Sequence, residues 1–263
     1  MPQKESIMDI NERKERILEI LGEQGQVKVA DLSRDFNISS ITIRSDLADL
    51  EEKGLLFRVH GGAINSYKTY CDMDLQQRLG TNLKAKQLIA KRAVEMIKPH
   101  DTVMFNSGTT TLSVFRAIPP QLQLNIVTNS ISIALEAGGN PNFNVVLLGG
   151  FVNPKYQFIY GDDAAAQLKN YHADKLFLSV DGVSPTAGFT TYYDREAELD
   201  RLMLAQSATK IITADSSKIG RTAFVNISDI SSADYLIADD SSCISDDLIV
   251  LKKKIRKIIT VKE

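Results

Sequence analysis

The spacing of apolar and polar residues changes near residue 65. Before this point apolar residues recur at the spacing of one helix face, whereas afterwards short β-rich runs alternate with helical stretches. Helical spacing begins at Asn11, stops at Gly22 and returns over residues 29–36. The change predicts a small helical domain over residues 9–65 and a larger α/β domain after it.

A third helix is predicted from Ser39 or Ser40, either of which can cap its N-terminus, to Lys53, which precedes a C-capping glycine. Residues 55–60 then alternate like a strand and meet a tight Gly-Gly turn. Helix, helix, turn, helix and hairpin, with the helix-turn-helix at about residues 27–46, is the layout of a winged helix-turn-helix. In that layout the third helix reads the DNA major groove.

The outer face of this third helix carries groups that suit base contacts. On a helical wheel Ile43 points inward, whereas Ile41 lies about 160° away and points outward. An outward isoleucine suits a thymine methyl group, and Arg44 can form a fork to guanine or phosphate. Two wing residues could reach phosphate or the minor groove. The predicted DNA contacts are Ser39, Ser40, Ile41, Thr42, Arg44, Ser45, Arg58 and His60.

The larger domain, residues 81–263, follows a polar, aperiodic stretch over residues 66–80 that predicts a linker. Short strands alternate with helical segments in it, which predicts βαβ crossovers and a largely parallel sheet. The predicted strands are residues 102–105, 124–128, 144–148, 175–180, 210–213, 235–238 and 257–261, and the helices include residues 109–117, 130–137, 162–171 and 194–208. Ligands in such sheets bind at the carboxyl ends of the strands.

Candidate chemistry gathers at those strand ends. Residues 106–111 form a glycine-containing, hydroxyl-rich loop that opens a helix, where backbone N–H groups suit a phosphate, although Ser and Thr there also serve as plain caps. The loop matches neither the Walker pattern nor the dinucleotide GxGxxG turn. Asp181, Glu196 and a lysine at other strand ends could do proton chemistry on a sugar, or could be ordinary turn and capping residues.

Charge changes the interpretation of the first domain. The chain holds 31 basic and 33 acidic residues, a formal net charge of −2, which argues against a histone-like or polybasic protein. Residues 1–67 hold 9 basic and 12 acidic residues, a net charge of −3. The stretches 39–45 and 57–64 nevertheless contain no acid. We therefore expect weak non-specific DNA binding, with affinity that depends on recognition and on avidity between several DNA-binding domains.

The first domain also has an alternative interpretation. Three short helices and a hairpin also fit a protein-interaction module.

Composition excludes several other classes. The chain is 43% hydrophobic, enough to bury a core, but no apolar run approaches the roughly 20 residues that span a bilayer. The N-terminal stretch lacks the apolar core of a secretion signal, so we expect a cytoplasmic protein with no membrane partner. Cys71 and Cys243 form no CxxC pair, and His60, His100 and His172 lack metal-ligand spacing. We expect no metal site and no cofactor.

Both domains resemble a known family. VKVADLSRDFNISSITIRSD at residues 27–46 and RVHGGA at residues 58–63 resemble the DNA-binding domain of the DeoR family of bacterial sugar-catabolism repressors. SGTTT at 107–111, TNS at 128–130 and DSSKIGR at 215–221 resemble its sensor domain. The resemblance, strongest to repressors of amino-sugar and sugar-alcohol operons, implies a homo-oligomer, dimer or tetramer. It would bind double-stranded operator DNA and be released by a phosphorylated sugar.

The resemblance also implies a sensor fold similar to ribose-5-phosphate isomerase. In that fold the 107–111 loop would hold phosphate, while Asp181, Glu196 and Lys218 would face the sugar. The expected effector residues are Asn106, Ser107, Gly108, Thr109, Thr110, Thr111, Thr128, Asn129, Asp181, Glu196 and Lys218.

Several positions depart from the family pattern. Asn106 stands where the family usually has Asp, residues 153–154 replace an arginine, Tyr193 occupies a common Asn position, and Tyr156 and Phe158 replace small hydroxyl residues. This pocket has lost a charge and gained rings, which fits a less charged or larger effector.

Two alternatives to a sugar-responsive repressor remain open. One is a sugar-phosphate isomerase with an appended DNA-binding domain, although Asn106 and Tyr193 suit holding a sugar rather than turning it over. The other is a DNA-binding protein whose C-terminal domain only oligomerises. We predict a protein that is not an enzyme and has no catalytic residues.

Overall fold

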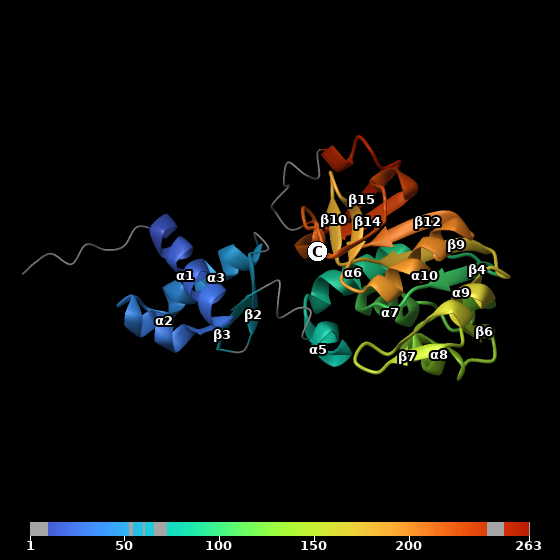
Figure 1. Ribbon diagram of the computed structural model, residues 1–263, viewed down its shortest axis with the longest axis horizontal. Helices are drawn as coiled ribbons and strands as arrows, with labels where there is room; N and C mark the ends of the chain where they lie inside the picture. Colours follow the sequence, from blue (N-terminus) through green and yellow to red (C-terminus); the bar gives the residue numbers. More distant parts are fainter. Residues whose placement is uncertain (1–9, 53–54, 60, 66–72, 241–249, 263) are drawn as a thin grey trace, which may run out of the picture. The chain divides into compact units, whose positions relative to one another are not determined.

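A computed structural model describes residues 10–52, 55–59, 61–65, 73–240 and 250–262 of the 263-residue chain (Figure 1). The chain divides into two compact units, Met1–Met73 and Asp74–Glu263, and each has hydrophobic clusters of its own. Within the described residues no helix combines the length and the apolar character that crossing a membrane requires.

The first unit is the predicted winged helix-turn-helix. Its elements are α1 (Ile10–Gln24), β1 (Gln26–Lys28), α2 (Val29–Asp35), α3 (Ser40–Glu52), β2 (Leu56–Val59) and β3 (Gly62–Asn65). Ile17 and Leu21 of α1 meet Ile43 and Leu47 of α3 in the core, all nearly fully buried. The sequence does not predict β1, because three residues are too few to show alternation; antiparallel pairing with β3 forms it, in the order β1-β3-β2.

The second unit contains the predicted parallel sheet. Its seven strands lie in the order β15-β14-β12-β9-β4-β5-β6, and every neighbouring pair is parallel. They are β4 (Thr102–Phe105), β5 (Leu124–Thr128), β6 (Phe143–Leu147), β9 (Ala173–Ser179), β12 (Ser207–Thr213), β14 (Tyr235–Asp239) and β15 (Lys257–Val261). The carboxyl ends of these strands therefore share one edge of the sheet.

Helices cover both faces of this sheet (Figure 1). One face carries α6 (Leu83–Val94), α7 (Thr109–Arg116) and α8 (Ile131–Ala137), and the other carries α9 (Asp162–Leu168) and α10 (Asp194–Ala205). Phe105 packs in the cluster of the first group and its neighbour Met104 in that of the second. Burial on both faces explains why the strands are continuous apolar runs. Two helices are shorter than predicted, and α10 ends early because β12 begins at Ser207, paired with Ala173.

Short antiparallel pieces complete the unit. A two-stranded ribbon and a three-stranded sheet, with two 3₁₀ turns, comprise β7 (Phe151–Asn153), β8 (Phe158–Tyr160), β10 (Gly182–Ser184), β11 (Gly188–Thr191), β13 (Val225–Ser228), η1 (Ser216–Lys218) and η2 (Ile230–Ser232). Each strand has only three or four residues, so pairing rather than sequence pattern defines it.

The predicted linker over residues 66–80 needs correction at its end, because residues 75–80 form helix α5 (Leu75–Gly80). Asp74 accepts from the Gln77 backbone N–H, and the Gln77 side chain accepts from the Asp74 N–H, which is a complete capping box. The Leu75 N–H donates to the Lys155 carbonyl, and Leu75 and Arg78 are buried. Tertiary contacts thus order a stretch whose polar sequence suggests a loop. Residues 66–72 lie outside the described residues.

Candidate DNA-reading surface and effector site

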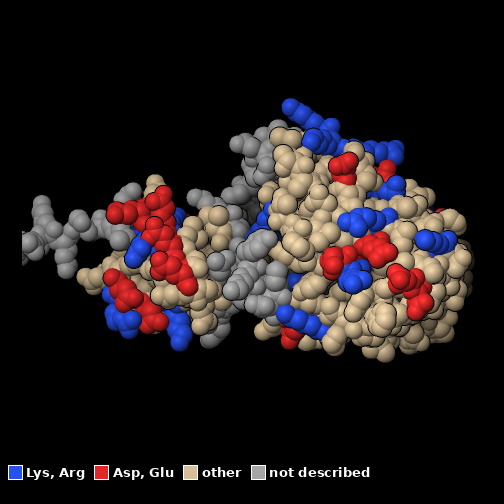
Figure 2. Space-filling model, viewed as in Figure 1, with Lys and Arg blue, Asp and Glu red and all other residues tan. Residues whose placement is uncertain are grey.

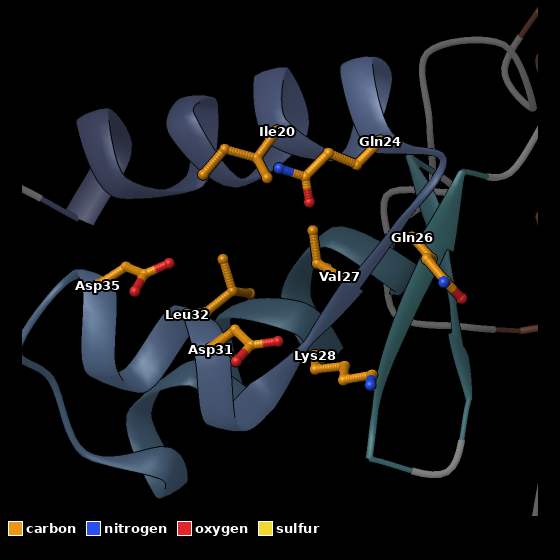
Figure 3. A pocket seen from close by; sticks show the side chains of 8 residues that line it. All are labelled: Ile20, Gln24, Gln26, Val27, Lys28, Asp31, Leu32 and Asp35. Atoms are coloured by element: carbon orange, nitrogen blue, oxygen red, sulfur yellow. The ribbon is translucent and has the colours of Figure 1, made fainter.

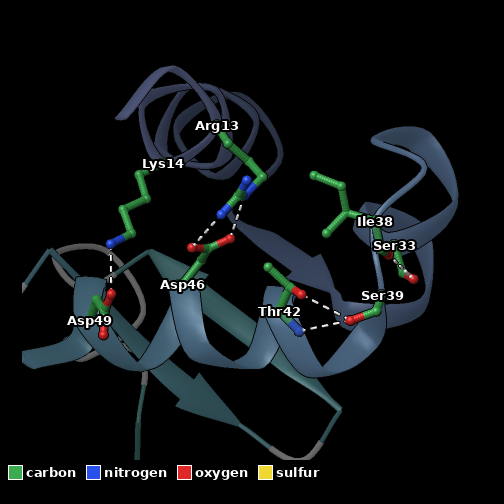
Figure 4. A network of polar contacts seen from close by, with 8 residues as sticks. All are labelled: Arg13, Lys14, Ser33, Ile38, Ser39, Thr42, Asp46 and Asp49. Carbon is green, nitrogen blue, oxygen red and sulfur yellow. Dashed lines mark hydrogen bonds and ion pairs between the residues drawn. The ribbon is translucent and has the colours of Figure 1, made fainter. Parts of the chain in front are cut away.

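Ion pairs with α1 hold the third helix of the first unit (Figure 4). The Arg13 guanidinium donates to both Asp46 carboxylate oxygens, at 2.5 and 2.9 Å, and both side chains are buried. Lys14 pairs with Asp49 at 2.6 Å. These pairs neutralise two of the acids of α3 from the side that faces α1.

The opposite side of α3 presents the predicted contact residues. Ile41 is 76% exposed, and Arg44 and Ser45 are exposed, whereas Ser40 and Thr42 are half-buried. The Arg44 guanidinium donates to the Ser40 hydroxyl, at 3.4 Å. The geometry leaves an isoleucine and an arginine projecting outward, as the wheel predicts.

Ser39 serves the helix itself. Its hydroxyl accepts from the Thr42 backbone N–H at 3.1 Å and lies 2.9 Å from the Thr42 hydroxyl, so Ser39 is the N-cap (Figure 4). Its predicted DNA contact would therefore have to share a hydroxyl already used for capping.

The wing turn depends on glycine. Gly61 has a φ of +82°, and a Cβ on Gly62 would lie 2.0 Å from the Val27 carbonyl oxygen, so β1 leaves no room for a side chain there. Arg58 on β2 is exposed, and its backbone N–H donates to Glu51 at 2.8 Å. Its guanidinium lies 3.9 Å from the other Glu51 oxygen, so part of its charge faces an acid. His60 lies outside the described residues.

Charges on the first unit are mixed. Figure 2 shows acidic and basic side chains close together on the visible face of this unit. Arg16 pairs with Glu19, and Arg34 pairs with both Asp31 and Asp35. In contrast, Arg44 makes no ion pair within the described ranges. A cation on α3 that no described acid neutralises suits a phosphate or guanine contact.

A small pocket of about 230 Å³ lies between α1, β1 and α2 (Figure 3). Its floor is apolar and its rim is polar: Ile20, Val27 and Leu32, with Gln24, Gln26, Lys28, Asp31 and Asp35. None of the predicted DNA contacts lines it.

In the second unit, Asn106 ties the ends of β4 and β9 together. Its amide oxygen accepts from the Ser179 N–H, and its amide nitrogen donates to the Ser179 carbonyl and, at 3.1 Å, to Asp200. The side chain is only 1% exposed. Asn106 therefore fixes the start of the predicted anion-binding loop, residues 106–111, against β9 and Asp200.

The loop after β4 presents backbone N–H groups, and one of its hydroxyls is used within the loop. A Cβ on Gly108 would lie 2.6 Å from that of Ser179, so the loop approaches β9 as only glycine permits. The Thr111 hydroxyl donates to the carbonyls of Asn106 and Gly108, which uses its proton. The first N–H groups of α7, at Thr109 onward, have no acceptor within the helix. An anion could accept from these N–H groups at the positive helix end.

Three buried carboxylates lie beside this loop: Asp181, Glu196 and Asp200. The Ser107 hydroxyl donates to Glu196, and the Thr191 hydroxyl lies within 3.2 Å of Asp181 and 3.4 Å of Glu196. Burial, helped by the nearby Asp181, raises the pKa of Glu196 to about 7, against the opposing hydrogen bond from Ser107. Burial and the charge of Glu196 raise the pKa of Asp200 well above its ordinary value.

Three buried cations complete the cluster: Arg78, Lys86 and Lys218. The Arg78 guanidinium lies 3.6 Å from Asp181. Burial lowers the pKa of both Lys86 and Lys218 to about 8, although the nearby Asp215 opposes this shift. The two lysines, with hydrogen bonds from Ser217 and Asn82, outweigh the effect of burial and lower the pKa of Asp215. The strand ends therefore hold a cluster of both signs.

Sequence reasoning missed Arg78 and Lys86. Arg78 stands on α5, and Lys86 donates to the Arg78 and Thr81 carbonyls at the end of that helix. The capping box at Asp74 was a detectable signal for α5. Lys86 has the same helical phase as the buried Ile89 and Ala93, which marks it as an inward cation.

An aromatic cluster borders the carboxylates. Tyr156 and Tyr193 have ring centroids 4.5 Å apart, and Phe158 lies 6.2 Å from Tyr193. The Arg78 guanidinium stacks 4.6 Å from the Tyr156 ring centre. Three of the positions that depart from the family pattern, Tyr156, Phe158 and Tyr193, are thus neighbours, and Arg78 connects them to Asp181.

Thr128 and Asn129 divide their roles between fold and site. The Thr128 hydroxyl donates to the Phe105 carbonyl and accepts from the Ser130 N–H, so it holds β5 against β4. The Asn129 amide donates to the Ile159 carbonyl, while its fully buried oxygen has no hydrogen-bond partner in the described part of the chain. Asn129 thus has an acceptor that no described group uses, whereas the Thr128 hydroxyl both donates and accepts within the fold.

No candidate metal-binding site is found in the ranges that the structure describes. No three His, Cys, Asp or Glu residues gather there in a group that could hold a metal ion.

Sequence comparison matches both units to described domains. Residues 13–69 match the DeoR-like helix-turn-helix domain, and residues 81–240 match the DeoR C terminal sensor domain.

Two named transcriptional regulators match over most of their own length. A protein of Escherichia coli O157:H7, named as a candidate aga operon transcriptional repressor, is 36% identical over 96% of this chain and 94% of its own. The HTH-type transcriptional regulator GlpR of Haloferax volcanii is 35% identical over 87% of this chain and 89% of its own. The ribose 5-phosphate isomerase A structure from Methanocaldococcus jannaschii aligns at 17% identity over 52% of this chain and 55% of that chain, with a TM-score of 0.39.

Proposed function

The chain belongs to the DeoR family of transcriptional regulators, and from this membership we propose that it represses a sugar-uptake or sugar-catabolism operon and leaves the operator when a phosphorylated sugar binds its second unit. It is a DNA-binding regulator and not an enzyme, because the relatives that it matches over most of their length are named as transcriptional regulators and repressors. The isomerase alternative is thereby excluded.

In this proposal α3 enters the major groove of double-stranded operator DNA. Ile41 and Thr42 face base edges, Arg44 forms a fork to guanine or phosphate, and the polar groups of Ser40 and Ser45 support the backbone contact. The exposure of Ile41 and Arg44 and the absence of an acid partner for Arg44 in the described residues support this orientation. Arg58 takes a phosphate position, with His60 as its predicted neighbour.

A surface with so few unneutralised cations would bind DNA weakly when only one DNA-binding domain, or head, is engaged. Each phosphate contact adds an increment of affinity, and linking heads multiplies it through effective concentration. We therefore assign the second unit a further role in forming a homo-oligomer, dimer or tetramer.

One observation carries the effector proposal: the loop after β4, whose free N–H groups can bind an anion, lies beside buried cations and carboxylates at one edge of the sheet. Backbone N–H groups at Gly108 and Thr109 suit a phosphate, and Arg78 and Lys218 supply charge. Carboxylates such as Asp181 accept from sugar hydroxyls. The aromatic cluster beside them favours an effector with an apolar face, larger than a small linear sugar phosphate.

Release can act through α5. This helix begins directly after the first unit ends at Met73, and it carries Arg78 into the cluster. A ligand that draws the guanidinium away from Asp181 would change the contacts of the helix that leads to the DNA-binding unit. A ligand shifts the equilibrium only by its preference for one arrangement, typically about 1 to 3 kcal/mol of coupling.

The proposal is tested with the purified full-length chain and a panel of sugar phosphates, each paired with its unphosphorylated sugar. We expect at least one sugar phosphate to raise the melting temperature while its partner sugar does not, because binding to the native state stabilises it. Failure of the whole panel would favour the alternative in which the second unit only oligomerises.

A further inference from the structure

Glu196 occupies an unusual electrostatic position in the proposed effector site. Its carboxylate is 7% exposed and receives hydrogen bonds from the hydroxyls of Ser107 and Thr191. Ser107 belongs to the loop proposed to take the anion. No cation within the described residues lies in ion-pair contact with Glu196, whereas Arg78 is directed to Asp181. The side chain is therefore held by neutral donors at the entry point of a negative charge.

The other charges around Glu196 come from several elements. The carboxylate of Asp181, after β9, disfavours the ionised form of Glu196, and Arg78 on α5 favours it. Asp200 lies one turn along α10, and the charge of Glu196 disfavours the ionised form of Asp200. Further away, Arg201 faces Asp200, and Lys218, Lys86 and Asp215 form the other side of the cluster. One Asp200 oxygen is fully buried without a hydrogen-bond partner in the described part of the chain. This arrangement has little capacity to stabilise another negative charge unless a carboxylate is neutralised.

We propose that Glu196 determines which charge state the effector site accepts: a phosphate-like oxyanion enters at residues 107–111 together with one proton, which Glu196 takes up from solvent. Glu196 is thus a specificity-determining residue that links effector binding to pH. The inference rests on the proposed function, because it concerns the same site.

The physical reason is the repulsion between two anions in a poorly solvated site. Two unit charges a few ångströms apart interact by several kcal/mol at the effective dielectric of a protein, about 20. Glu196 already has a pKa of about 7, so keeping its proton near neutrality costs little. An anion beside it raises that pKa further, and by linkage an anion binds better to the protonated form.

Sulfate is the suitable probe because it has no titrating proton near neutrality, so any pH dependence comes from the protein. Sodium sulfate is titrated calorimetrically into the full-length chain at constant ionic strength, between about pH 5.5 and pH 7.5. This window lies below the pKa of about 8 of the two buried lysines, whose deprotonation would also weaken anion binding. We expect the dissociation constant to rise about fourfold across it, since one proton with a pKa of about 7 is linked to binding.

The decisive variant is Glu196→Gln, which keeps the shape of the side chain and removes its titration. Its affinity for sulfate should be nearly constant over the same pH range. Glu198→Gln is the matched control, because Glu198 stands exposed on the same helix and the substitution makes the same chemical change outside the buried cluster. The control should retain the fourfold dependence.

A second variant guards against misfolding of the first. Ser107→Ala removes a hydrogen bond that favours the ionised carboxylate, so the pKa of Glu196 should rise and the loss of affinity should begin at a higher pH. Wild-type affinity that is independent of pH, or a Glu196→Gln variant with wild-type pH dependence, overturns the inference but leaves the proposed function intact. A wild-type chain that binds no sulfate at any pH also overturns the inference, whereas the proposed function fails only if the sugar-phosphate panel gives no binding.

Discussion

At the scale of single residues, two charged side chains of α3 that lie two positions apart differ in burial and in ion pairing. Arg44 is exposed and lacks an acid partner in the described residues, whereas Asp46 is buried against Arg13. The sequence predicts the direction of Ile41 and Ile43, because helical phase is a local property. It does not predict the partner of Asp46, because that ion pair joins residues 33 positions apart.

Substitution of Arg44 by alanine should abolish operator binding without unfolding the first unit, because we propose that the guanidinium contacts DNA and because Arg44 is exposed and does not pack in the core. Fluorescence anisotropy with operator DNA measures the first effect and circular dichroism the second. Arg16→Ala is the control, since Arg16 is also exposed but pairs with Glu19 on α1. Unchanged affinity of the Arg44 variant would show that α3 is not the reading helix.

Asp200→Asn should reduce the pH dependence of stability. The pKa of Asp200 is raised in the folded state, so the unfolded chain releases this proton more readily and wild-type stability falls as pH rises above the ordinary carboxyl range. Each pH unit up to the folded pKa costs about 1.4 kcal/mol. Urea denaturation at pH 5 and pH 8 should show the variant gaining stability relative to wild type at the higher pH. An equal difference at both values would mean that Asp200 is ionised in the native protein.

At the scale of elements, length and burial decide what the sequence can predict. The inner parallel strands are buried on both faces, so they appear as apolar runs, and all seven strands are found close to their expected bounds. The short strands β7, β8 and β10 leave no such signal. Helix α5 is hidden for a related reason: it has six residues, largely polar, and it is ordered by a capping box and by contact with residue 155. For this reason the linker prediction placed Arg78 outside the proposed effector site.

Asp74→Ala tests the role of α5. Loss of an N-cap costs about 1 kcal/mol of local stability, and a looser α5 should hold Arg78 less firmly at Asp181. We expect several-fold weaker binding of the effector identified in the sugar-phosphate panel, measured by calorimetry, with little change in operator affinity. Gln76→Ala, at an exposed position of the same helix, should leave both unchanged. Effector affinity equal to wild type in the Asp74 variant would remove α5 from the account.

At the scale of the whole molecule, the near-neutral net charge predicts weak non-specific attraction to DNA. Acidic residues on the first unit face basic partners such as Arg13, Lys14 and Arg34, so little uncompensated positive charge is left for non-specific attraction. Recognition and the number of linked heads would then set affinity. The departures at Asn106 and Tyr193 change the character of the proposed effector site but not the family or the fold. For this reason the sequence predicts the regulator class and not the identity of the proposed sugar effector.

The central claim is that a phosphorylated sugar in the second unit weakens the hold of the first unit on DNA. The direct measurement is the dissociation constant of the full-length chain for its operator, at fixed salt, without and with a saturating sugar phosphate that binds it. The account predicts a rise of about 5- to 150-fold, the range that 1 to 3 kcal/mol of coupling gives. An operator affinity that stays the same when the sugar phosphate is bound would contradict it.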